Sequence, residues 1–166
     1  RTNRRKRFRC PGVIDSMIDF RNPSTNFGRS TMLYLRGGNG TNAVLRYQLT
    51  GLPANAQIIS ATLGIYMIPR ADVENRHQMT TTVYSLIRSF NELQVNWFQA
   101  AAGNPWGVPG VNDPASDFNL WPSYEVEHYF WMQRADQKPQ WFTYTVTSMV
   151  QSWVDDPASN AGFIIK

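Results

Sequence analysis

The chain has 166 residues, of which 42% are hydrophobic, and this is enough to bury the core of one domain of ordinary size. It contains no run of about eighteen consecutive apolar residues, so the sequence predicts no membrane-spanning helix. The net charge of +4 is misleading, because six of the sixteen basic residues lie in the first nine positions. The rest of the chain has ten basic against twelve acidic residues, which argues against a nucleic-acid-binding surface on the body.

Residues 1–12 are predicted to form a basic arm. Its cations are Arg1, Arg4, Arg5, Lys6, Arg7 and Arg9. A block of like charges is often a solvated tail or a processing site, but it can also bind a negatively charged partner by long-range attraction. We expect the arm to bind a neighbouring molecule, and the absence of Met at position 1 predicts a processed or trimmed chain. Cys10 is the only cysteine, so no internal disulfide can form, and we expect a free thiol.

Alternation of apolar and polar residues predicts β-strands in the remaining chain. The pattern is clearest in residues 42–69, where Leu45, Tyr47 and Leu49 alternate with Arg46 and Gln48 before a turn rich in Gly, Pro and Asn. A second alternating run follows this turn. Strands are predicted at residues 13–20, 31–36, 44–49, 57–68, 79–88, 140–146 and 162–166.

Helical periodicity is found once, near the C-terminal end of the sequence. There Ser148 is predicted to cap a short helix that buries Val150, Trp153 and Val154 and is ended by Pro157. Many strands at short intervals with almost no helix favour an all-β fold, an antiparallel β-sandwich. We therefore predict one β-sandwich domain over residues 13–166.

Residues 98–139 are predicted to be a long loop insertion that contains five prolines and many aromatic residues. Loops longer than about fifteen residues are uncommon in compact domains unless they are functional. Flat rings can stack on the faces of sugars or anchor a protein interface. The candidate ligand or interface aromatics are Trp106, Trp121, Tyr124, Tyr129 and Trp131, with a satellite hydrophobic core as the alternative role.

Several short motifs carry a resemblance to a known family. They comprise Asp15 to Ile18, residues 22–28, residues 30–33, VLRYQL at 44–49, LPANA at 52–56, SATLGIY at 60–66, FNELQVNW at 90–97, TVTSMVQSW at 145–153 and NAGFIIK at 160–166. Together they resemble the DNRLRE-type β-sandwich domain of secreted surface proteins, polysaccharide-active enzymes and phage virion proteins. The resemblance implies a jelly-roll-like, non-catalytic module, in some relatives a binder of acidic polysaccharides. It also implies that Trp97 and Trp153 are core residues.

The sequence predicts no catalytic residues. The two histidines, His77 and His128, lie in no nucleophile motif. Three pairs of carboxylates could in principle act as acid and base on a glycosidic bond, but we interpret them as exposed acidic residues. These pairs are Asp113 with Asp117, Glu125 with Glu127, and Asp155 with Asp156.

Other polar motifs give weaker predictions. Clustered His and Cys ligands are missing, so no zinc site and no cofactor are predicted, although Asn112, Asp113 and Asp117 could offer oxygen ligands to calcium. Arg46 and Arg88 are expected to form internal ion pairs. The glycosylation sequon at residues 39–41 is explained by a tight turn.

Two functional hypotheses follow. The first is a structural interaction module on an assembled surface, such as a virion, where the arm and the aromatic insertion bind neighbouring subunits. The second is an extracellular or cell-surface carbohydrate-binding module, in which aromatic rings stack on sugars and arginines bind acidic groups.

Overall fold

The computed structural model describes residues 5–10, 12–38, 40–68, 80–126 and 139–166, with the backbone alone for residues 121–126. Within them the fold is all-β, with one α-helix near the C-terminal end, which confirms the predicted fold class. The elements are β1 (Val13–Asp19), β2 (Thr41–Tyr47), β3 (Thr62–Met67), β4 (Thr81–Leu86), β5 (Gln99–Ala101), β6 (Asn104–Pro105), β7 (Phe118–Val126), β8 (Gln140–Thr145), α1 (Thr147–Asp155), the 3₁₀ helix η1 (Pro157–Ser159) and β9 (Phe163–Ile165).

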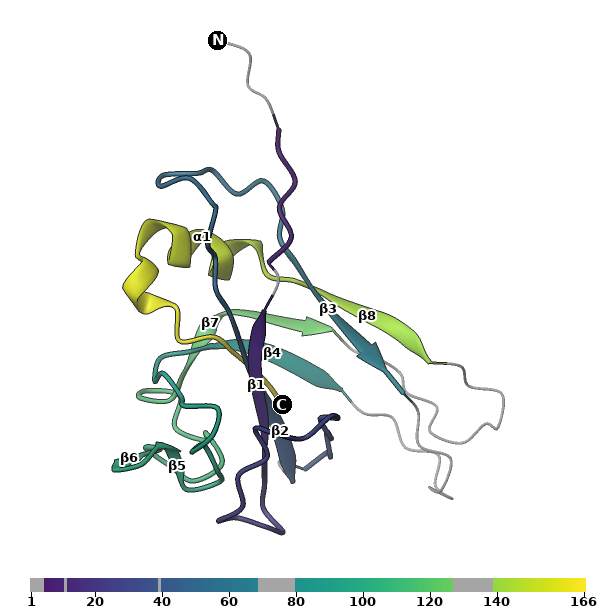
Figure 1. Ribbon diagram of the computed structural model, residues 1–166, viewed down its shortest axis with the longest axis vertical. Coiled ribbons are helices and arrows are strands. Elements are labelled where there is room, and N and C mark those ends of the chain that lie inside the picture. The colour runs from purple at the N-terminus through teal and green to yellow at the C-terminus, as the bar shows by residue number, and fades with distance from the viewer. Residues whose placement is uncertain (1–4, 11, 39, 69–79, 127–138) are drawn as a thin grey trace.

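The described strands form three antiparallel sheets (Figure 1). The largest sheet has five strands in the order β1-β2-β9-β4-β7, while β3 pairs with β8 and β5 pairs with β6. A jelly roll has two sheets built from eight strands. The sheets of five, two and two strands found here are sandwich-like, but they do not confirm the jelly-roll part of the prediction.

Both faces of the five-stranded sheet are covered and bury hydrophobic side chains. Neighbouring residues of a strand point to opposite faces, so β2 and β9 each contribute to both cores. On the first face Val44 and Ile164 pack with residues of the segment 90–111, namely Val95, Trp97, Ala100, Trp106 and Val111. On the second face Leu45 and Ile165 pack under the β3–β8 sheet and helix α1, against Leu63, Tyr144, Met149 and Trp153. Trp97 and Trp153 are thus core residues, as the resemblance implied.

Two strand predictions were wrong: one predicted strand does not form, and another is shorter than predicted. Residues 31–36 form no strand, and only Arg36 pairs with Thr41 in an isolated bridge. The strand predicted at residues 57–68 begins only at Thr62, because Ile58 N–H donates to Gln151 Oε1 and Ala61 N–H donates to Thr147 Oγ1. Side chains of helix α1 therefore accept hydrogen bonds from backbone N–H groups that would pair with a neighbouring strand if β3 were longer.

The predicted helix cap was also wrong. The helix begins at Thr147, and Val146 occupies the N-cap position without a side-chain cap, so Ser148 lies inside the helix. Met149 and Trp153 are its fully buried residues, whereas Val150 and Val154 are only half-buried. None of the helices in the described part of the chain is long and apolar enough to cross a membrane.

The predicted loop insertion at residues 98–139 is largely structured where it is described. It contains the β5–β6 hairpin and strand β7, which forms an edge of the five-stranded sheet. Its prolines do not prevent this, since Pro105 lies in the two-residue strand β6 and Pro122 lies on an edge strand, where a missing N–H is tolerated.

Candidate functional site

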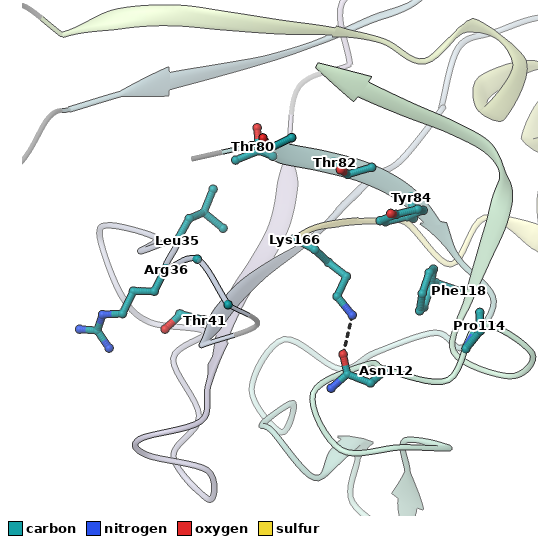
Figure 2. Close-up of a pocket in the computed structure, with 13 residues that line it drawn as sticks. Leu35, Arg36, Thr41, Thr80, Thr82, Tyr84, Asn112, Pro114, Phe118 and Lys166 are labelled. Carbon is teal, nitrogen blue, oxygen red and sulfur yellow. Dashed lines mark hydrogen bonds between the residues drawn. The ribbon is translucent and has the colours of Figure 1, made fainter. Parts of the chain in front are cut away.

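An open groove lies at the end of the first face of the five-stranded sheet, beyond the segment that covers the core. It encloses about 500 Å³. Its floor is formed by Thr82, Tyr84 and Lys166, one wall by residues 35–38 with Thr41, and the other by Asn112 and Phe118 (Figure 2). We call this the Lys166 groove.

Lys166 directly follows β9, and its backbone pairs with Thr82 through hydrogen bonds of 3.0 and 2.9 Å. Its side chain crosses the groove toward Asn112 (Figure 2). The Nζ atom donates to Val111 O at 2.7 Å and to Asn112 Oδ1 at 2.6 Å, and it lies 4.9 Å from the ring centroid of Phe118. Burial lowers the pKa of Lys166 from 10.5 to about 8, against the opposing effect of the Asp117 charge. The ammonium group of Lys166 is therefore charged at neutral pH and loses its proton at a lower pH than an exposed lysine does.

Asp117 fixes the wall that carries Asn112. This carboxylate has no exposed surface, and it accepts hydrogen bonds from the backbone N–H groups of Gly107 at 2.7 Å, Val108 at 3.2 Å and Asp113 at 3.2 Å. Arg88 Nε lies 3.4 Å from Asp117 Oδ1, which confirms the predicted internal ion pair of Arg88. The carboxylate thus acts as an internal acceptor that closes the loop of residues 107–117.

The opposite wall is held by a second buried carboxylate, Asp19. It accepts hydrogen bonds from Thr41 Oγ1 at 3.0 Å and Asn22 Nδ2 at 2.9 Å, and it pairs with Arg36 at 3.4 Å. Burial alone raises the pKa of Asp19, but these hydrogen bonds and the Arg36 charge outweigh it, so that the pKa lies below its ordinary value. Thr41, the hydroxyl residue of the sequon, is therefore buried and structural, while Asn39 lies outside the described residues.

The predicted calcium ligands come together in the loop of residues 107–117, but their oxygens accept hydrogen bonds from protein donors. Asp113 accepts from Ser116 Oγ at 2.7 Å and from Ala115 N–H at 2.9 Å, and the Ser116 bond contributes most to lowering the pKa of Asp113. Asn112 Oδ1 accepts from Lys166. In the residues that are described, no group of three or more His, Cys, Asp or Glu side chains could hold a metal ion.

Of the other two carboxylate pairs, the one that is described, Asp155 with Asp156, gives no acid and base facing a common site. Asp155 accepts a hydrogen bond from Gln151 Nε2 at 2.9 Å, and Asp156 caps the 3₁₀ helix by accepting from Ala158 N–H at 3.2 Å. The side chain of Glu125, together with Glu127, His77 and His128, lies outside the described residues. Arg46 lies 5.6 Å from the ring centroid of Phe90, a cation–π contact in place of the predicted ion pair.

The aromatic prediction needs one correction. Trp106 is only 4% exposed, and its Nε1 donates to Asn96 O at 3.0 Å, so it is a core residue and not a ligand or interface residue. It packs inward because residues 90–111 cover the first face of the sheet. Trp121 and Tyr124 lie in strand β7, but their side chains, and all of Tyr129 and Trp131, are outside the described residues.

Sequence reasoning missed the most exposed aromatic pair of the described structure. Trp141 is 66% exposed and Tyr66 is 51% exposed, and they face each other across β8 and β3. The signal was present in the predicted strand at residues 140–146. Its inward positions end in Tyr144 and Val146, so the alternate positions Trp141, Thr143 and Thr145 had to face solvent.

Residues 5–10 of the basic arm lie at one end of the molecule (Figure 1). Arg5, Lys6, Arg7 and Arg9 are all exposed, and none of these four cations forms an ion pair with a described residue. Cys10, at the base of the arm, is a free thiol. Arg1 and Arg4 lie outside the described residues.

Comparison with family models and with curated proteins identified no relative of the chain. The membership of the DNRLRE-type domain family consequently stays a prediction from the motifs of the sequence.

Proposed function

We propose that the chain is a non-catalytic interaction module that attaches to an assembled surface, such as a virion, where it is a capsid decoration or tail component. The observation that carries this proposal is the basic arm. Four neighbouring cations project into solvent without an internal counter-charge among the described residues, while the body of the chain is slightly acidic. An arm of this kind attracts an anionic neighbour at long range, and the attraction weakens with salt.

A non-catalytic role is supported by the way four carboxylates of the described residues are used. Asp19 and Asp117 are buried acceptors in the walls of the groove, and Asp113 and Asp156 bond to backbone N–H groups of their own loops. General acid–base catalysis needs a carboxyl group that reaches a substrate proton. These four carboxylates instead stabilise loops.

The test is native mass spectrometry of the protein isolated from its source, which is expected to find the chain in complexes with other subunits. The double substitution Arg5→Ser with Arg7→Ser should release it. Arg21→Ser with Arg29→Ser removes the same charge from exposed positions of the body and serves as the matched control. A wild-type chain that is isolated as a free monomer, or an arm variant that stays in the complex, contradicts the proposal.

The Lys166 groove favours a second candidate function, binding of an acidic polysaccharide. A partly buried ammonium group lies beside Phe118 and Tyr84, and Thr80 and Thr82 also line the groove. A uronate-type chain could therefore place its carboxylate at Lys166 and its sugar rings against the aromatic side chains. Isothermal titration with acidic and neutral polysaccharides tests this candidate. Heat with acidic polymers that Lys166→Met abolishes would support it, and the absence of heat with all of them would refute it.

A further inference from the structure

The outer face of the β3–β8 sheet exposes two aromatic rings side by side. Tyr66 and Trp141 occupy directly opposite positions of the two strands, and their ring centroids are 5.3 Å apart. The inner face of the same strands is buried, since Leu63 and Tyr144 belong to the second core. The rings therefore stand on a rigid support, with one side of the sheet fixed and the other open to solvent.

Gly64 determines how the indole of Trp141 lies on this face. It precedes Tyr66 by two residues and so shares its face, and a Cβ atom at Gly64 would come within 3.3 Å of Trp141 Cε3 and 3.4 Å of Cζ3. The indole thus lies over the glycine, where the missing side chain leaves room for it. A ring that leans on its own sheet cannot project into a pocket of a partner, as an anchoring Trp does in a protein interface. It offers its free face to another flat group.

Within the described strands β3 and β8, the side chains that share the outer face with the rings are polar and uncharged. Thr62, Thr143 and Thr145 share the outer face with Tyr66 and Trp141, and the described residues of β3 and β8 include no charged side chain. Single-stranded nucleic acids stack on aromatic side chains only beside cations that neutralise the phosphates, and an acidic sugar would also need a cation. A flat ligand with apolar faces and hydroxyl edges, a neutral pyranose, meets both the rings and the threonine hydroxyl groups.

We propose that the outer face of the β3–β8 sheet binds a neutral β-linked glucan chain, with successive sugar rings stacked on Trp141 and Tyr66. The ring separation of 5.3 Å is close to the repeat of neighbouring sugars along such a chain. The ring planes are inclined by 54°, so they suit a single twisted chain better than the flat surface of a crystalline polymer. This inference does not depend on the proposed function, because it uses neither the arm nor the Lys166 groove.

The test is affinity electrophoresis of the full chain in gels that contain hydroxyethylcellulose or barley mixed-linkage β-glucan. Retardation of the wild type is expected, and Trp141→Ala or Tyr66→Ala should weaken binding by about tenfold, the change that the loss of one stacked ring produces. Phe98→Ala removes another exposed ring, 47% exposed on a different part of the molecule, and should leave binding unchanged. Gly64→Val keeps both rings but displaces the indole, so it should also weaken binding.

Each outcome decides the proposal. Failure of the wild type to bind either glucan, or equal binding by Trp141→Ala, overturns it. If sedimentation finds a dimer that Trp141→Ala dissociates and no glucan binds, the face belongs to a second copy of the chain. Because Trp141 is exposed, its variant should melt within a few degrees of the wild type, so lost binding cannot be attributed to unfolding. The arm variant should still bind glucan, which separates a failure of this inference from a failure of the proposed function.

Discussion

Replacement of Asp117 by Ala is expected to destabilise the protein more than any substitution of an exposed acidic residue. The buried carboxylate accepts hydrogen bonds from three backbone N–H groups of the loop that it closes, and it faces Arg88. Truncation leaves those donors without an acceptor and also leaves the guanidinium group without its counter-charge. Water can reach Arg88 in part, since its side chain is 27% exposed, and this limits the loss.

The magnitude follows from these contacts. Hydrogen bonds to a charged acceptor contribute about 1.5–3 kcal/mol each, but neighbouring bonds to one group are not additive. Removal of one partner of a buried ion pair costs about 3–5 kcal/mol. We therefore expect the free energy of unfolding to fall by about 3–5 kcal/mol for Asp117→Ala, a large part of the roughly 5–15 kcal/mol of a typical domain. Asp117→Asn keeps the volume and one acceptor oxygen, so it should cost less.

Urea unfolding followed by tryptophan fluorescence measures this change, provided that the slope of the free energy against urea stays the same. The control is Asp155→Asn on helix α1, an exposed acidic residue whose loss should change stability by no more than about 0.5 kcal/mol. If Asp117→Ala also falls within about 1 kcal/mol of the wild type, the carboxylate does not organise the loop as described. A double-mutant cycle with Arg88→Met then isolates the energy of the ion pair itself.

Three further predictions concern packing and charge. Trp153→Ala should lower the free energy of unfolding by about 3–5 kcal/mol in the same assay, because it empties a buried site whose ring lies 4.7 Å from that of Phe163. Gly28→Ala should destabilise, since its Cβ would collide with the backbone carbonyl of Glu92, whereas Gly37→Ala meets open space and should be neutral or stabilising by a few tenths of a kcal/mol. For Lys166, the folded protein releases its proton near pH 8 and the unfolded chain near 10.5, so this group makes stability rise with pH between those values. Chemical denaturation of the wild type and Lys166→Met at pH 7, 8 and 9.5 checks that slope, and equal slopes for the two proteins would contradict it.

Strands with a strong alternating pattern could be predicted from sequence, and strands defined by distant partners could not. Leu45 and Tyr47 alternate with Arg46 in a strand that packs on both sides, and the period of two identified it. Residues 31–36 carry a similar local pattern, yet Leu33 and Leu35 pack against the second core as coil, and only Arg36 pairs with a strand residue, Thr41. The start of β3 was also misplaced, since Gln151 and Thr147 of a distant helix bind the backbone before Thr62.

In the candidate sites, too, features set by the local pattern could be predicted, and features set by distant parts of the chain could not. Exposure of Trp141 follows from the alternation of its strand, so a stricter application of the pattern would have found it. Burial of Trp106 does not follow from any local pattern, because it depends on residues 90–111 folding back over the first face of the sheet. Asp117 is similar: in sequence it is one acidic residue among loop residues, and only the closed loop directs Gly107, Val108 and Asp113 N–H groups to its oxygens.

The two candidate binding surfaces lie on opposite sides of the five-stranded sheet. The Lys166 groove opens on the first face, whereas the ring pair of Tyr66 and Trp141 lies on the outer side of the layer that covers the second face. Distant sites without shared contacts contribute independently, so substitutions at one surface should leave binding at the other unchanged. The arm is a third, separate element. If it binds an anionic neighbour and the ring pair binds a glucan, as proposed, the β-sandwich-like core holds the two partners apart.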